Sequence, residues 1–342
     1  MSQQCTPRIK ADREGTPSVP ITPPETNLEG KTVIVIGANT GLGFEASRQF
    51  LTLGASRVIL AVRSASKGEV ARQHLLSDLT VKKHNPHAEV KVMLLDLSDY
   101  KSIVNFSSDV KKELDAVHIV LLNGGLNLMN CKETVDGHEM TPQANYLSNA
   151  LLTLELLPLL EQTAIEAKAP TRISWVGSRA QAFNSFNKKP LPSDESVLHR
   201  FDDKTQYRSF LRYSDSKLLV SMFVQELAKY IRQDKVVINH MCPGLVSTSI
   251  DANIPRYLKP IVGIVKKIRA RTPEEGARIL IHAAAVAGPD THGAFIVDNK
   301  IVPIAPMTQT DSGKEMQTKL WDETLVELTK VDKTVVDVFA QG

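Results

Sequence analysis

The pattern of hydrophobic and polar positions changes abruptly at residue 31. From there, short runs rich in β-branched residues alternate with longer stretches in which apolar residues recur at helical spacing. The short runs are almost continuously hydrophobic, which is typical of parallel strands covered on both faces. We predict strands at 31–37, 57–62, 89–96, 118–124, 171–177, 236–241 and 293–298, and helices at 42–53, 67–83, 100–114, 137–161, 213–232 and 273–287.

This alternation of strands and helices predicts an α/β fold, a doubly wound Rossmann-type domain with a parallel sheet of roughly seven strands. No linker, internal repeat or change of composition divides the chain, so we expect one domain at 28–342. Residues 1–27 contain five prolines among polar residues and no apolar run. This composition predicts a disordered tail rather than a signal peptide.

Two long excursions follow predicted strands, at 179–212 and at 247–271. Ligands of open α/β sheets bind at the carboxyl ends of the strands, so both excursions are candidates for loops over a site. The second excursion mixes apolar and basic residues. It would suit a lid over a hydrophobic substrate, a peripheral contact with a membrane, or an ordinary helix with a solvated basic face.

Composition narrows the choice of partners. The chain of 342 residues has 41 basic and 38 acidic side chains, and its net charge of +3 provides no strong field for nucleic acid. Its three cysteines lie far apart without a CxxC motif, so we expect neither a disulfide framework nor a metal site. The longest apolar segment, 150–160, is too short to span a bilayer. We therefore expect a cytoplasmic protein that binds a small molecule.

Three glycines stand where the first strand would pass into the first helix. Gly37, Gly41 and Gly43 follow the run VIVI with the spacing G-x-x-x-G-x-G. Glycines in this place allow a tight turn and a close approach of the backbone to a pyrophosphate, whose charge the helix N-terminus favours. A turn with no ligand would need similar residues, but the context of strand, turn and helix favours a dinucleotide site.

A tyrosine and a lysine are paired in the stretch YSDSK. Tyr213 and Lys217 are four residues apart, about one helical turn, so both side chains leave the same face of a helix. Such pairs also occur by chance on solvated helices. Carbonyl reduction needs a proton donor, and a tyrosine could be that donor. Its ordinary pKa near ~10 is too high for efficient proton exchange at neutral pH unless a nearby cation, here Lys217, lowers it.

Together these motifs resemble those of the short-chain dehydrogenase/reductase family, in its single-domain type. The glycine motif matches the family's T-G-x-x-x-G-x-G except that Ile36 replaces the threonine, and the resemblance extends from Lys31 to about Val302. The stretches 271–284 and 293–302 resemble the retinol-dehydrogenase-like branch and its fungal relatives. The resemblance implies an oxidoreductase that interconverts a carbonyl and a secondary alcohol on a moderately hydrophobic small molecule, in secondary metabolism.

The resemblance also implies catalytic roles. Tyr213 would transfer a proton, and Lys217 would lower the tyrosine pKa and hold the ribose of the nicotinamide. Ser178 matches the second serine of the family's V-S-S and would donate to the substrate oxygen, while Gly177 replaces the first serine. Thirty-five positions (213 − 178) separate Ser178 from Tyr213, more than is usual in the family, so we expect a loop over the site.

Two asparagines match family positions. Asn145, in QANYLSNA, would support a water-linked proton relay, although Ser148 stands where the family has glycine. A helix cap or a polar group in the core is the alternative role for Asn145. Asn123, in LLNGG, matches the family's N-A-G signature, with Gly124 in place of alanine.

Further cofactor contacts follow from the same resemblance. Asp96 would contact the adenine ring, and Val246 and Thr248 would meet the nicotinamide carboxamide. The full set of predicted cofactor-binding residues is Gly37, Gly41, Leu42, Gly43, Arg63, Asp96, Asn123, Tyr213, Lys217, Val246 and Thr248.

Arg63 bears on which cofactor is used. It ends the second predicted strand and can bind a 2′-phosphate with two parallel hydrogen bonds, and no acidic residue beside it would take a 2′-hydroxyl. This predicts NADP(H) rather than NAD(H). A surface arginine that simply ends a strand is the alternative.

The sequence is compatible with three functions. The first is the oxidoreductase. The second is a cofactor-binding protein with little turnover that acts by regulation or association, and the departures from the family motifs are compatible with it. An isomerase or dehydratase on the same scaffold is the third. The predicted helices at 137–161 and 213–232 resemble those that pair in dimers and tetramers of the family, which suggests a homo-oligomer.

Overall fold

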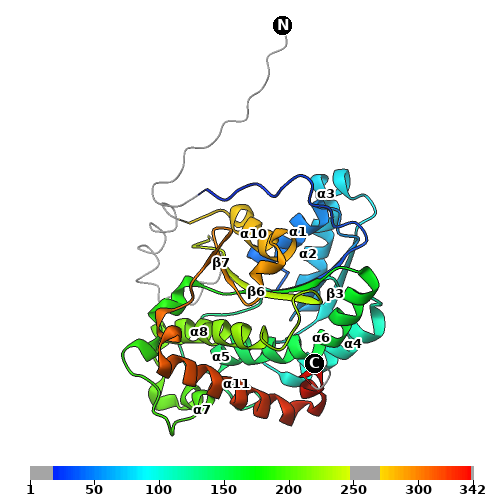
Figure 1. Ribbon diagram of the computed structural model, residues 1–342. Helices are drawn as coiled ribbons and strands as arrows, with labels where there is room; N and C mark the ends of the chain where they lie inside the picture. Colours follow the sequence, from blue (N-terminus) through cyan, green and yellow to red (C-terminus); the bar gives the residue numbers. More distant parts are fainter. Residues whose placement is uncertain (1–17, 247–269, 340–342) are drawn as a thin grey trace.

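The computed structural model describes residues 18–246 and 270–339. Within them an eight-stranded sheet runs through the middle of the molecule in the order β3-β2-β1-β4-β5-β6-β7-β8 (Figure 1). The strands are β1 Thr32–Ile36, β2 Arg57–Val62, β3 Glu89–Leu94, β4 Ile119–Leu122, β5 Thr171–Val176, β6 Val236–Cys242, β7 Phe295–Val297 and β8 Lys300–Val302.

The predicted parallel sheet is confirmed, with one strand added. Strands β1 to β7 correspond to the seven predicted strands and pair in parallel, whereas β8 pairs antiparallel with β7. Asp298 and Asn299 join these two strands with φ angles of 52° and 60°. Asp and Asn tolerate this left-handed region, so the Asp-Asn pair was an available hairpin signal.

Helices cover both faces of the sheet (Figure 1). On one face lie α1 Gly41–Thr52, α2 Ala65–Ser77, α3 Leu79–His84 and α10 Pro273–Ile281, and on the other lie α4 Tyr100–Glu113, α6 Ser148–Ala167 and α8 Ser209–Leu227. Successive side chains of a strand point to opposite faces. Accordingly, Ile34 and Ile36 belong to the core beneath α6 and α8, and Val33 and Val35 belong to the core beneath α1 and α10.

Two predicted helices differ in detail from the observed ones. The helix predicted at 67–83 is divided at Asp78, whose extended backbone ends α2 and whose carboxylate accepts from the backbone N–H groups of Thr80 and Val81 at the start of α3. The helix predicted at 137–161 begins with α5 Met140–Pro142, passes through the π-helical turn η1 Gln143–Leu147, and continues as α6. No described helix is long and apolar enough to cross a membrane.

The N-terminal boundary also differs from the prediction of a tail at 1–27. Val19 is buried and belongs to the same core as Leu28, and its carbonyl accepts a hydrogen bond from Arg278 of α10 (3.4 Å). The described chain therefore joins the domain at least nine positions (28 − 19) before the predicted boundary. Of the second predicted excursion, only residues 270 and 271 lie within the described part of the chain.

A helix that we did not predict, α11 Asp311–Val331, packs against α8 on the side away from the sheet (Figure 1). The excursion at 179–212 forms short 3₁₀ turns and α7 Val197–Asp202, which also contacts α11. Glu323 of α11 links the two helices α7 and α11, because its carboxylate accepts hydrogen bonds from the backbone N–H groups of Val197 and Leu198. This chain's own segments therefore cover the outer face of α8, one of the helices that we expected to pair in an oligomer.

We expect Trp321→Ala in α11 to lower the free energy of unfolding by about 3–5 kcal/mol, since it would remove a large buried ring. Trp321 is 5% exposed and stacks on Tyr230 with ring centroids 5.0 Å apart and on Phe223 at 5.5 Å. Val326, 62% exposed on the same helix, is the matched control, and Val326→Ala should cost less than about 0.5 kcal/mol. Urea unfolding measures both, and equal losses would show that α11 is not part of the core.

Candidate active site

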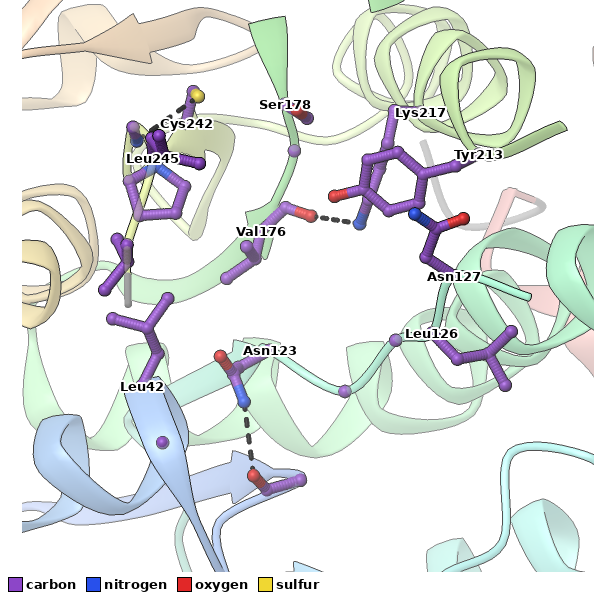
Figure 2. Close-up of a pocket in the computed structure, with 18 of the residues that line it drawn as sticks. Leu42, Asn123, Leu126, Asn127, Val176, Ser178, Tyr213, Lys217, Cys242 and Leu245 are labelled. Carbon is purple, nitrogen blue, oxygen red and sulfur yellow. Dashed lines mark hydrogen bonds between the residues drawn. The ribbon is translucent and has the colours of Figure 1, made fainter. Parts of the chain in front are cut away.

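A cavity of about 520 Å³ opens at the carboxyl ends of β1, β4, β5 and β6 (Figure 2). The strand order reverses between β1 and β4, which is where doubly wound sheets bind ligands. The residues predicted from the sequence that line this cavity are Gly37, Gly41, Leu42, Asn123, Ser178, Tyr213, Lys217 and Val246. They come from five separate parts of the chain, so folding is required to bring them together.

The glycine loop forms one wall of the cavity. Gly37 and Gly41 have φ angles of 73° and 61°, which favour glycine. A Cβ atom on Gly43 would lie 2.4 Å from the Gly37 carbonyl oxygen and 2.5 Å from the Asn123 side chain. Thr40 precedes α1 without capping it through its side chain, so N–H groups at this helix end are available to an anion. The loop therefore fits a pyrophosphate.

Asn123 supports this loop from the neighbouring strand. Its Nδ2 group donates to the carbonyl oxygens of Ile36 (3.1 Å) and Gly37 (3.2 Å), as Figure 2 shows for one of these bonds. The side chain thereby joins the end of β4 to the end of β1. Asn123 therefore lines the cavity and also holds the glycine loop in place through these two hydrogen bonds.

Tyr213 and Lys217 project from α8 into the cavity, side by side in Figure 2. The Lys217 Nζ atom lies 5.6 Å from the centre of the Tyr213 ring and donates to the Val176 carbonyl oxygen at the end of β5 (2.7 Å). Lys217 is only 5% exposed, and this burial lowers its pKa to about 8 from an ordinary value of 10.5. At neutral pH the group is still mainly the cation that the predicted chemistry needs.

Ser178 follows β5 on the same side of the cavity. Its Oγ atom accepts from the Ala180 N–H (3.1 Å), which fixes the side chain at the start of a 3₁₀ turn. Among the described residues no acceptor takes the hydroxyl hydrogen of Ser178. The hydroxyl can therefore donate to a ligand in the cavity.

Asn145 lies behind the cavity wall rather than on it. Its side chain is buried in the π-helical turn η1, where Oδ1 accepts from Leu126 N (2.7 Å) and Nδ2 donates to Leu126 O (2.9 Å) and to Ser216 Oγ (3.0 Å). Ser216 in turn donates to the Tyr213 carbonyl (2.8 Å). Asn145 thus joins a lining residue to α8, and its part in a proton relay stays a prediction.

The remaining predicted residues are more distant from the cavity. Arg63 is exposed at the end of β2, and no hydrogen bond or ion pair of its guanidinium occurs within the described chain. Asp96 follows β3, where its Oδ1 accepts from the N–H and hydroxyl of Ser98. Gly43 packs beneath the glycine loop. Thr248 lies outside the described residues.

Several lining residues were not predicted. They are Asn39, Thr40, Gly125, Leu126, Asn127, Val176, Cys242 and Leu245. Each lies within a few positions of a motif residue in the sequence, so proximity to a motif was the available signal. Their chemistry alone carried none, because asparagine, leucine and threonine are common in loops of all kinds.

Comparisons with known proteins agree with this geometry. Residues 31–184 match the family model described as short chain dehydrogenase. The chain is 44% identical to "Short chain dehydrogenase macD" of Penicillium terrestre, over 91% of this chain and 95% of that protein. It is 42% identical to "Short-chain dehydrogenase/reductase tropG" of Talaromyces stipitatus, over 92% of this chain and 96% of that protein.

This chain belongs to the short-chain dehydrogenase/reductase family. Its members bind NAD(H) or NADP(H), and the dehydrogenases and reductases among them are oxidoreductases. Among solved structures, the fold is similar to that of Pseudomonas aeruginosa RhlG in complex with NADP, with a TM-score of 0.61 and 22% identity over 81% of this chain and 97% of that one. A 3-oxoacyl-(acyl-carrier-protein) reductase of Agrobacterium tumefaciens with NADP bound has a TM-score of 0.59 and 19% identity, over 80% and 94% of the two chains.

Three departures from the motifs of short-chain dehydrogenases have local physical causes. A Cβ on Gly124 would lie 2.8 Å from the Leu97 side chain and 2.9 Å from Ile36. A Cβ on Gly177 would lie 3.2 Å from the buried ring of His240. The Ser148 hydroxyl donates to the Leu97 carbonyl (2.7 Å). Each residue therefore fits its own surroundings in this chain.

A buried ion pair holds the Pro243-Gly244 turn of this dehydrogenase. Arg271 is 5% exposed; it donates to the Pro243 carbonyl (3.2 Å) and to the Asp298 carboxylate (2.5 Å). Gly244, at φ 79°, packs on the guanidinium, since a Cβ there would lie 2.5 Å from Arg271 Nη1. The second oxygen of Asp298 is 3.5 Å from Arg179, the residue after Ser178. The hairpin of β7 and β8 thereby fixes two walls of the cavity.

We expect Lys217→Met to remove a pH dependence from the stability of this dehydrogenase without cofactor. Because the pKa of Lys217 is lower in the folded than in the unfolded state, the folded state binds fewer protons between about pH 8 and 10.5. The wild-type free energy of unfolding therefore gains a contribution as pH rises through that window. Between pH 7 and 9.5 this amounts to roughly 2 kcal/mol.

Urea unfolding of both proteins at the two pH values measures this effect. The difference in stability, variant minus wild type, should fall from pH 7 to pH 9.5. The comparison cancels the titration of all other groups. A difference that does not change with pH would mean that the ammonium of Lys217 is well solvated in the folded protein.

Proposed function

We propose that this chain is an NADP(H)-dependent oxidoreductase that interconverts a carbonyl and a secondary alcohol on a moderately hydrophobic small molecule of secondary metabolism. One observation carries the proposal: Tyr213, Lys217 and Ser178 line the same cavity as the glycine loop. A proton donor, a cation and a second hydroxyl therefore lie beside a site for a dinucleotide. The similarity to fungal dehydrogenases from Penicillium terrestre and Talaromyces stipitatus supports the assignment to secondary metabolism.

The described residues fit a nicotinamide dinucleotide. Gly37, Gly41 and the N-terminus of α1 would hold the pyrophosphate, and Arg63 would bind the 2′-phosphate, since its guanidinium has no acceptor within the described chain. Asp96 would contact the adenine. Two similar folds were solved with NADP, which supports NADP(H). The bound cofactor supplies the hydride or accepts it.

The chain's own residues would handle the proton and the developing charge. Ser178 would donate its hydroxyl hydrogen to the substrate oxygen and orient the carbonyl. Tyr213 would give its phenolic proton to that oxygen during reduction and take it back during oxidation. Lys217 would stabilise the tyrosinate through its charge, and Asn145 would hold the cavity wall at Leu126 in place.

Tyr213→Phe tests the chemistry directly. The substitution keeps the ring but removes the proton donor, so we expect kcat for reduction of a carbonyl to fall by roughly 10² to 10⁴. NADPH oxidation against a panel of carbonyl compounds measures turnover, and fluorescence titration measures NADPH affinity, which should change little. Unchanged turnover in Tyr213→Phe would defeat the mechanism. Tight NADPH binding by the wild type with no turnover on any compound would favour a regulatory cofactor-binding protein.

Arg63→Ala tests the choice of cofactor. Loss of a charged hydrogen-bonding partner should weaken NADPH binding by roughly ten- to a hundredfold and leave NADH binding nearly unchanged. Arg57, at the other end of β2, is the matched control, because it pairs with Glu89 (2.7 Å) away from the cavity. Arg57→Ala should alter neither affinity. Equal losses for NADPH and NADH in Arg63→Ala would argue against recognition of a 2′-phosphate.

A further inference from the structure

A second cavity lies between the excursion at 179–212 and the first two turns of α8. Its volume is about 520 Å³, and it shares no lining residue with the candidate active site. We call it the insertion cavity and define it by Phe186, Arg200, Phe201, Arg212 and Asp215. Neither the family motifs nor the proposed function assigns it a role.

The insertion cavity has an excess of positive charge. Besides the two arginines of its definition, Lys188, Lys189 and Arg208 also line it. Asp215 is the one carboxylate in the lining, and its Oδ1 already accepts from the Ser185 N–H (2.6 Å). Five cationic side chains and one carboxylate thus line the cavity, and Glu195 and Glu139 lie near the two arginines outside the lining. This excess of positive charge favours an anionic ligand.

Arg200 is buried with part of its hydrogen-bonding capacity unused. It is 6% exposed, and its guanidinium lies over the Phe186 ring at 4.8 Å. Nη2 donates to the Lys189 carbonyl (3.1 Å), whereas Nη1 has no hydrogen-bond partner within the described chain. The carboxylate of Glu195 is 3.8 Å from Nη1, which is too far for a hydrogen bond.

Arg212 is likewise buried with N–H donors that make no hydrogen bond. It is 3% exposed, and its guanidinium is held over the rings of Phe201 (4.8 Å) and Tyr207 (5.3 Å). Neither Nε nor Nη2 makes a hydrogen bond among the described residues. Glu139 Oε2 lies 3.5 Å from Nε and forms an ion pair with it, but no hydrogen bond joins the two atoms.

Buried charges without hydrogen bonds are costly and are rare in native proteins unless a ligand completes them. Here two buried guanidiniums with unused N–H donors line one cavity, and each lies over an aromatic ring. Guanidinium groups match the oxygens of phosphate and carboxylate groups in geometry and charge. We propose that the insertion cavity binds an organic oxyanion, a phosphate ester or a carboxylate, between Arg200 and Arg212.

A ligand in the insertion cavity would influence the active site through α8. Arg212 directly precedes Tyr213, and Asp215 lies between Tyr213 and Lys217 in α8. A bound oxyanion would tie the excursion to these turns and hold them in place. The ligand is therefore expected to stabilise α8 without entering the catalytic cavity.

Isothermal titration with inorganic phosphate and with citrate, at constant ionic strength, tests this proposal on the full chain. We expect binding of at least one of them by the wild type, and binding weaker by roughly ten- to a hundredfold in Arg200→Met. The anion that binds more tightly distinguishes a phosphate from a carboxylate ligand. Arg57 lines neither cavity and pairs with Glu89, so Arg57→Ala should bind as the wild type does. No binding by the wild type, or equal binding by the wild type and Arg200→Met, would overturn the proposal.

A second comparison avoids buried substitutions, in case Arg200→Met fails to fold. Lys188 and Lys189 are exposed at the rim of the insertion cavity, and Lys82 and Lys83 are an exposed pair on the distant helix α3. The double substitution to Met at 188 and 189 should weaken the anion severalfold, and the same change at 82 and 83 should not. Equal effects would mean that net charge alone attracts the anion, which would contradict a built site.

Discussion

The buried ammonium of Lys217 is the constraint on which the active site depends. A charge in this environment is stable only if an acceptor compensates for lost water, and the acceptor is the Val176 carbonyl at the end of β5. That bond joins α8 to the end of β5 beside the cavity that Tyr213 and Ser178 line. Burial also lowers the pKa of the lysine to about 8, so this ammonium loses its proton more readily than an exposed lysine does.

Much of the fold could be predicted from the sequence because its signals are local. All seven predicted strands were found, since buried parallel strands are almost continuously apolar. The glycine loop was recognisable from spacing, and the φ angles of Gly37 and Gly41 explain the need for glycine. The same holds for the presence of Tyr213 and Lys217 in one cavity, because four residues make about one turn of helix.

Other features depend on contacts between distant parts of the chain and had no local signal. The brace from Asn123 to Gly37 and the contact between Gly177 and His240 are set by how strands align in the sheet. The hydrogen bond from Asn145 to Ser216 could not be foreseen either, because Ser216 stands seventy-one residues later in the sequence (216 − 145). In α11, by contrast, Met316, Leu320, Thr324 and Leu328 are all buried at a spacing of four. That helix was missed although its periodicity was available.

The cover that α11 provides over α8 has a consequence for the folding of the chain. Part of the Phe223 ring on α8 is covered by Trp321, almost a hundred residues away in the sequence (321 − 223). Contacts this distant in sequence form slowly, because the loop between them must close first. During synthesis α8 would therefore present an aromatic surface until α11 emerges, and chaperones that bind exposed apolar segments could bind it in that interval.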